Sequence, residues 1–240
     1  MTVPVLNPTQ TRLGSLLRGE AEYFRAWIQT CQATDLNRSL MIIVAGSGLY
    51  GAAIGYWRAP LQALFVAAKL PLIILLTTLG NAVLNALLAP LLGLNIGFKQ
   101  SLLAILMSFT IASTILGALS PIAAFMIWNM PPLLAGSENS GATYNLIQLS
   151  LVAIIAFAGI AANLRLIQLL QHLSGKAAIA RRVLFAWLAG NLFLGSQLAW
   201  ILRPFIGSPD LPVVFLRPTA FQGNFYETVF RAAMHLLQLQ

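Results

Sequence analysis

Residues 101–128 read SLLAILMSFTIASTILGALSPIAAFMIW, a stretch without a single charged side chain. A helix needs about 20 apolar residues to cross a hydrocarbon core of roughly 30 Å, and this stretch is long enough to do so. Four further segments are apolar over similar lengths and hold almost no charge, residues 40–57, 69–92, 144–170 and 183–205. We therefore predict an all-α fold, a polytopic membrane bundle with about five transmembrane helices.

The composition of the whole chain supports a membrane protein. Hydrophobic residues make up 58% of it and charged residues only 8%, against about 25% charged in a soluble domain. A closed β-barrel is the other structure that satisfies its backbone inside lipid, and its strands alternate over about ten residues. Residues 149–164, LSLVAIIAFAGIAANL, do not alternate, which excludes the barrel.

We divide the chain into three regions: a cytoplasmic amphipathic segment (1–38), the transmembrane bundle (39–205) and an extracytoplasmic tail (206–240). In the first region, apolar residues at near-helical spacing predict an amphipathic helix over 10–31 that lies in the membrane interface or docks on another subunit. These residues are Leu13, Leu17, Phe24, Ile28 and Cys31. In the tail, Asn224 and Glu227 have the spacing of a capping box, which predicts a terminal amphipathic helix through Leu237.

The distribution of basic residues predicts the orientation. Nine of the fourteen Lys and Arg residues fall on one side of the predicted bundle: Arg12, Arg18, Arg25, Arg38, Lys99, Arg165, Lys176, Arg181 and Arg182. The other side has Arg58, Lys69, Arg203, Arg217 and Arg231. Because basic loops stay in the cytoplasm, we expect a multi-pass protein of a cell inner membrane with a cytoplasmic N-terminus and an extracytoplasmic C-terminus. Membrane lipids are then expected partners, and nucleic acid is not.

Small residues in the first span predict a close helix contact. Gly51 and Gly55 form a GxxxG pair, and Gly48 with Ala52 forms a second pair of small residues four apart. Helices in a bilayer associate by close packing, for which such pairs are typical. The partner is another helix of the bundle or another protein, and we favour the bundle.

The second and third spans each carry a polar stripe. Thr77, Asn81 and Asn85 repeat every four residues and share one face of a helix, as do the polar residues of the third span, Thr110, Ser113 and Thr114. Such stripes line a path for a substrate or a lipid headgroup, or they form ordinary hydrogen bonds between helices. We favour the second interpretation because no acidic residue accompanies them.

Lys69 has two interpretations. If the second span begins near Leu61, Lys69 lies roughly 12 Å inside the membrane and is a functional candidate. If the span begins at Lys69, Pro71 falls in the first helical turn, where proline is tolerated. We favour the second alternative, because it leaves a full span without a buried charge.

The sequence offers no catalytic constellation. All six acidic residues fall outside the predicted spans: Glu20, Glu22, Asp35, Glu138, Asp210 and Glu227. The two histidines, His172 and His235, fall on opposite sides of the predicted membrane, and Cys31 is the single cysteine. We therefore expect no catalytic residues, no metal site, no cofactor and no enzymatic activity.

The most distinctive stretch runs from the fifth span into the tail. Pro204 ends the predicted span, and later prolines forbid regular helix while many aromatic residues follow, so the tail must pack on the membrane face or on a partner. Arginine offers five donors from one rigid fork. We predict that Arg203 hydrogen-bonds the backbone between Gly207 and Arg217 and clamps the tail over the bundle. The alternative role for Arg203 is an anchor on lipid phosphate.

Five motifs carry a resemblance: LRGEAEYFR (17–25), GLYGAAIGYW (48–57), KLPLIILLTT (69–78), GSQLAWILRPFIGSP (195–209) and GNFY (223–226). Together they resemble an uncharacterised family of bacterial multispanning inner-membrane proteins, a resemblance that implies no activity. The five-span layout is also similar to the Yip1 family of membrane-trafficking proteins, whose first span carries DLYGP where this chain reads GLYGA.

These observations favour a non-catalytic membrane protein, a structural or accessory subunit of a larger inner-membrane complex whose partners are other membrane protein subunits. The alternative is a transporter or lipid-handling protein that uses the polar stripes of the second and third spans.

Overall fold

The computed structural model describes residues 14–15, 18, 27–130, 140–207 and 212–227, with residues 140–147 described by their helical backbone. All regular secondary structure in these residues is helical, which confirms the all-α prediction. The five long helices are α3 (Ala33–Tyr56), α4 (Pro60–Leu91), α5 (Phe98–Trp128), α6 (Ser140–Ser174) and α7 (Ala177–Ile201). Each is long and apolar enough to cross a membrane.

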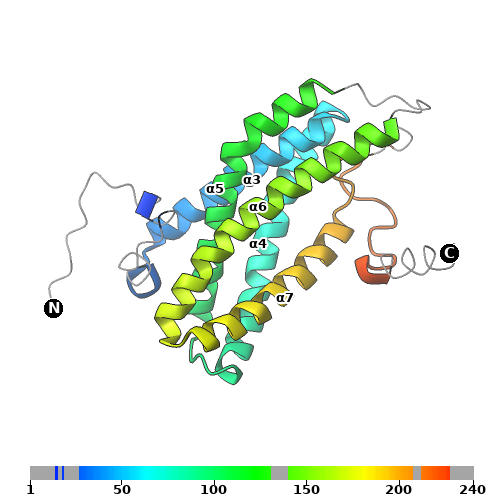
Figure 1. The fold of residues 1–240 in the computed structure, drawn as a ribbon. Helices are drawn as coiled ribbons and strands as arrows, with labels where there is room; N and C mark the ends of the chain where they lie inside the picture. Colours follow the sequence, from blue (N-terminus) through cyan, green and yellow to red (C-terminus); the bar gives the residue numbers. More distant parts are fainter. Residues whose placement is uncertain (1–13, 16–17, 19–26, 131–139, 208–211, 228–240) are drawn as a thin grey trace.

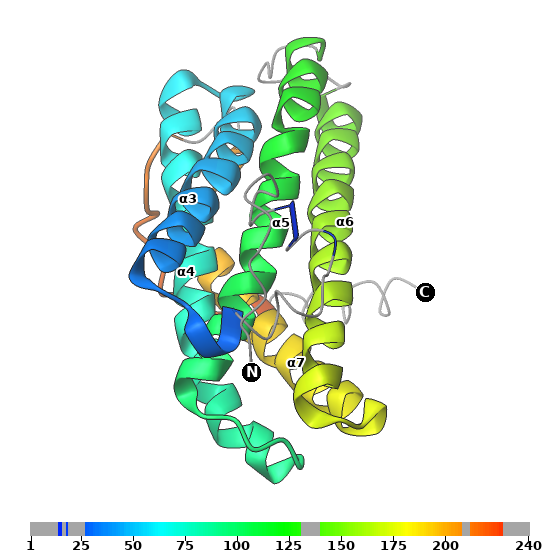
Figure 2. The same cartoon turned by 90° about the vertical axis from the view of Figure 1, so that its left-hand side faces the viewer.

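Successive helices run in opposite directions and form one bundle (Figure 1). α3 packs against α4 and α5, which also touch each other, while α6 packs on α5 and α7 packs on α4 and α6 (Figure 2). α3 and α5 are therefore the most enclosed helices, and α6 and α7 leave most of their surface to the surroundings. Exposed leucine, isoleucine and phenylalanine side chains on α6 and α7 suit contact with lipid.

Local sequence explains where several helices begin. Pro60 occupies the first position of α4, where its missing N–H costs nothing. At the start of α5, the Gly97 N–H donates to the side-chain oxygen of Gln100 at 3.2 Å. Gly175 separates α6 from α7 with φ of +64°, a left-handed conformation that glycine adopts without strain. The tight turn then sends α7 back along the bundle.

Two of the predicted helix limits are wrong. α3 begins at Ala33, seven residues before the first apolar segment at residue 40. α4 begins at Pro60 instead of Lys69, because Lys69 is accommodated inside the helix. α7 ends at Ile201 instead of Phe205, because the chain turns away from the helix axis just before Pro204.

The glycines of α3 bring its backbone against α4. A Cβ atom at Gly51 would lie 2.5 Å from the carbonyl oxygen of Val66, and one at Gly55 would lie equally close to that of Gln62. Real Cβ atoms do not come within 3.0 Å of such an atom, so the backbones would have to separate. Gly48 lies on the same side of α3, and Ala52 is half-buried. The close contact is therefore made within the bundle.

The segment before α3 also packs against the bundle. Trp27 and Ile28 are buried in the hydrophobic core, and the Trp27 indole N–H donates to the carbonyl oxygen of Leu103 on α5 at 3.0 Å. This end of the predicted N-terminal helix thus docks on its own chain. Most of that helix, and the terminal helix beyond Glu227, lie outside the described residues. At the start of the terminal helix, the Glu227 N–H donates to the Asn224 side-chain oxygen at 2.8 Å, as the predicted N-cap requires.

Candidate functional site at the C-terminal tail

Lys69 is fully buried inside the protein and lies well within α4, so the helix start expected at Lys69 is wrong. It is the tenth residue of α4, about 13 Å along the helix from Pro60 at 1.5 Å per residue, and its exposed fraction is 0%. The ammonium group donates to the carbonyl oxygen of Pro204 at 2.9 Å. Pro204 follows α7 and lies 135 residues away in the sequence, so this partner could not be read from the neighbourhood of Lys69.

Gln62 reaches the same turn of the tail from two turns earlier on α4. Its side-chain N–H₂ donates to the carbonyl oxygens of Pro204 and Phe205, each at 2.9 Å, and the residue is 1% exposed. Gln62 and Lys69 are seven residues apart and therefore share a helix face. Together they donate to backbone carbonyl oxygens of the non-helical segment just after α7, which have no helical partners.

Aromatic rings surround the buried ammonium group. The Lys69 nitrogen lies 5.2 Å from the ring centroid of Phe215 and 5.9 Å from that of Phe205. Both distances are within reach of a cation–π attraction, which is stronger when the cation is desolvated. Phe215 also packs edge-to-face on Phe65 of α4, with centroids 5.5 Å apart. The tail is thus held on α4 by one cation, one amide and a group of rings.

Arg203 binds the backbone of the tail beyond the segment predicted for it. Its guanidinium donates to the carbonyl oxygen of Trp200 at 2.6 Å and to that of Thr219 at 3.4 Å, and it stacks on the Trp200 ring with the central carbon 3.6 Å from the centroid. Thr219 lies two residues beyond the range predicted for this bond, 207–217, of which residues 208–211 lie outside the described residues. The reason is a turn at residues 217–220, where the Ala220 N–H bonds the Arg217 carbonyl and leaves that of Thr219 facing Arg203.

Further contacts join the rest of the tail to α7. The Ser196 hydroxyl bonds the Tyr226 hydroxyl at 2.9 Å, and the ring of Tyr226 stacks on Phe193 with centroids 5.7 Å apart. The Trp200 indole N–H donates to the Gln222 carbonyl at 3.4 Å. Although its backbone is held, the tail exposes apolar side chains: Phe215, Leu216, Phe221, Phe225 and Tyr226. Phe221 is 77% exposed.

The polar stripe of α4 faces α7. The Asn81 side-chain N–H₂ donates to the Trp187 carbonyl oxygen at 3.1 Å and to the side-chain oxygen of Asn191. Thr77 is buried near Gly195, and neither side-chain atom of Asn85 has a hydrogen-bond partner among the described residues. Because Gln62 and Lys69 contact the chain just after α7, the whole polar face of α4 is directed at α7 and its continuation.

The polar stripe of α5 faces other neighbours. The hydroxyls of Thr110, Thr114 and Ser120 each donate to a carbonyl oxygen of the preceding turn of α5, at 2.7–2.8 Å. The backbone at Ser113 lies against Gly46 of α3, and the Ser113 hydroxyl has no partner in the described part of the chain. The two stripes therefore do not line one common path.

Two residues that the sequence analysis missed belong to these contacts. Gln62 extends the polar face of α4, and its spacing of seven residues from Lys69 was the available signal. Gly46 allows α3 to approach α5, but no small residue four positions away marks it. In the part of the chain that the structure describes, no three His, Cys, Asp or Glu side chains gather as they would around a metal ion. Comparison of the chain with family models, with curated proteins and with solved structures gave no match.

Proposed function

We propose that this protein is a non-catalytic accessory subunit of a membrane complex, and that its C-terminal tail is the surface that binds the partner. The partner is another integral membrane protein. The observation that carries the proposal is the combination of a fixed tail backbone with exposed aromatic side chains. We call the exposed residues Phe215, Leu216, Phe221, Phe225 and Tyr226 the aromatic surface.

The backbone of the tail is preorganised for binding a partner. A partner that binds a mobile loop must supply the free energy of ordering it, about 0.5–1.5 kcal/mol for each immobilised side chain. Here Lys69, Gln62 and Arg203 already hold the backbone of the tail. The free energy of ordering it is therefore supplied when the chain folds and not when the partner binds. Aromatic residues are enriched in the cores of protein interfaces, where they dominate the binding energy. A fixed aromatic surface next to the spans suits a partner that lies in the same membrane.

The arrangement of charge also favours a binding role over catalysis. Lys69 is surrounded by carbonyl oxygens and rings of its own chain. Of the six acidic residues in the sequence, the structure describes Asp35 and Glu227, at the N-terminal ends of helices. Neither is placed to act as a proton donor or acceptor for Lys69.

The alternative function, a transporter or lipid-handling protein, requires the stripes of α4 and α5 to face a shared path. Asn81 is hydrogen-bonded to α7, while Ser113 lies against α3. The geometry thus favours a helix-packing role for both stripes and leaves the transport alternative without a specific supporting observation.

Purification in mild detergent tests the proposal. We expect the wild-type chain to retain a partner at a fixed stoichiometry and Phe221→Ser to lose it, because Phe221 is the most exposed ring of the aromatic surface. Leu87→Ser is the matched control, since Leu87 is 67% exposed near the C-terminal end of α4, far along the helix from Gln62 and Lys69. Quantitative mass spectrometry of the eluates measures the result. Equal retention by Phe221→Ser and wild type, or no stoichiometric partner at all, would count against the proposal.

A further inference from the structure

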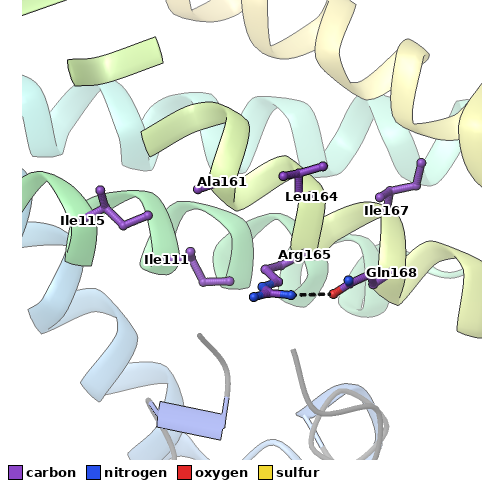
Figure 3. Close-up of a pocket in the computed structure, with 7 residues that line it drawn as sticks. All are labelled: Ile111, Ile115, Ala161, Leu164, Arg165, Ile167 and Gln168. Carbon is purple, nitrogen blue, oxygen red and sulfur yellow. Dashed lines mark hydrogen bonds between the residues drawn. The ribbon is translucent and has the colours of Figure 1, made fainter. Parts of the chain in front are cut away.

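A hollow of about 350 Å³ lies between α5 and α6, in the half of α6 that leads to the α6–α7 turn (Figure 3). Its size falls within the range of roughly 300–1,000 Å³ that is usual for small-molecule sites. Most of its wall is apolar, formed by Ile111, Ile115, Ala161, Leu164 and Ile167. Leu164 is 59% exposed, so the hollow lies at the outer surface of the bundle, which suits contact with lipid.

One cation lines this apolar hollow. Arg165 is half-buried, and its guanidinium donates to the side-chain oxygen of Gln168 at 3.2 Å. Figure 3 shows the two side chains next to each other on α6. Among the described residues no carboxylate forms an ion pair with Arg165, and four of its five N–H donors have no hydrogen bond. A cation in a membrane span requires a partner, because the hydrocarbon solvates neither the charge nor the donors.

The position of Arg165 indicates which partner fits. Arg165 lies nine residues before the end of α6, about 13 Å from it, and its bond to Gln168 draws the guanidinium toward that end. Lys176, Arg181 and Arg182 follow at the same end, around the α6–α7 turn. Several basic residues next to a membrane surface attract anionic lipids, whose headgroups lie at the level of these residues. Long arginine side chains reach headgroups from such depths.

We propose that this hollow binds one anionic phospholipid. The lipid phosphate accepts hydrogen bonds from Arg165 and from the side-chain N–H₂ of Gln168, and one acyl chain fills the space between Ile111, Ile115 and Leu164. Arginine suits this role because its planar fork donates two parallel hydrogen bonds to a phosphate. This site is on a different pair of helices from the tail and does not depend on the proposed partner.

Lipid retention by the full chain tests the site. The protein is reconstituted in vesicles of phosphatidylcholine and phosphatidylglycerol in equal amounts, extracted in mild detergent and examined by native mass spectrometry. We expect wild type to retain one phosphatidylglycerol per chain in preference to phosphatidylcholine. Arg165→Gln should weaken its binding about tenfold or more, as the loss of charge-assisted hydrogen bonds predicts. Ala161→Phe should block acyl-chain binding while it keeps Arg165.

Two controls separate this site from general attraction and from a site for free anions. Arg182→Gln removes an exposed charge from the first turns of α7 and should leave the retained lipid unchanged. Excess inorganic phosphate should not displace the lipid, because phosphate lacks the acyl chain. Equal retention by wild type, Arg165→Gln and Ala161→Phe, in samples with the wild-type unfolding temperature, would overturn the proposal. Displacement by inorganic phosphate would also overturn it, since the hollow would then bind a free anion.

Discussion

Lys69 illustrates how a single residue depends on contacts that the local sequence does not contain. The sequence favoured an interfacial lysine because an unpaired charge inside a span is costly. In the structure, the carbonyl oxygen of Pro204 and the rings of Phe205 and Phe215 supply the surroundings of the charge. All three come from the segment after α7. The depth of Lys69 could therefore be predicted only together with the course of the tail.

Arg203 allows a prediction at the same scale. Arg203→Lys keeps the charge but cannot bond the carbonyls of Trp200 and Thr219 from one planar group while it stacks on an indole ring. We expect the tail to lose about 1 kcal/mol of local stability, the usual net contribution of a hydrogen bond. Amide hydrogen exchange of residues 212–227 should become faster by a factor of about five to ten.

The control for this prediction is Arg217→Lys, the same type of substitution at another arginine of the tail. The Arg217 guanidinium forms no hydrogen bond with the described residues. Its exchange rates should match those of wild type. Equal protection in Arg203→Lys would show that Arg203 acts as an anchor on lipid phosphate, and the clamp would be abandoned.

At the scale of the elements, the polar face of α4 is predictable in its position but not in its partner. The four-residue repeat of Thr77, Asn81 and Asn85 correctly places all three on one face, and all three are buried. The repeat does not specify which neighbour that face meets. α7 meets it because small residues, Gly190 and Gly195, leave room beside Asn81 and Thr77. Those glycines are typical of many membrane helices and gave no distinct signal.

The double substitution Asn81→Leu with Asn85→Leu tests the role of this face. We expect stability to change by about 1–2 kcal/mol, since hydrogen bonds between membrane helices average about 0.6 kcal/mol and reach about 1.7. Most of the change should come from Asn81, which bonds both Trp187 and Asn191, whereas Asn85 has no partner in the described residues. Reversible unfolding in detergent measures the single and the double variants.

Folding and function are separated in this test. If the stripe packs helices, partner retention should survive wherever the double variant remains folded and abundant. Loss of a transport activity in a double variant that remains folded would instead favour a substrate path through the bundle. The accessory-subunit proposal would then be withdrawn.

At the scale of the whole molecule, the alternation of helix direction gathers most of the described basic residues at one end. Arg38, Lys99, Lys176 and Arg182 all belong to the end that includes the start of α3 and the α6–α7 turn. The number of spans followed from the lengths of the apolar segments alone, because the thickness of a bilayer sets the length of a helix. The arrangement of the five helices did not follow, since it depends on contacts such as those of Gly46 and Gly51.

The orientation in the membrane can be tested with single cysteines in a Cys31→Ser background. Cysteines at Ser137 and Ser208 should react with a membrane-impermeant thiol reagent added from outside, and one at Ser174 should react only after permeabilisation, because basic ends stay in the cytoplasm. Burial raises the pKa of the Cys31 thiol, with a smaller contribution from Asp35. The native cysteine should therefore react slowly with the reagent in the unsubstituted chain. Labelling of Ser174→Cys in intact spheroplasts would reverse the orientation.

We propose that the aromatic surface binds another membrane protein, and crosslinking in native membranes detects this contact. A photoactivatable phenylalanine analogue replaces Phe221 in the full chain, and the same analogue at Leu87 serves as the reference for lipid-facing positions. We expect one discrete protein adduct from position 221 and lipid adducts from position 87. Lipid adducts alone at both positions would contradict it, because the tail would then lie on the membrane and not on a partner.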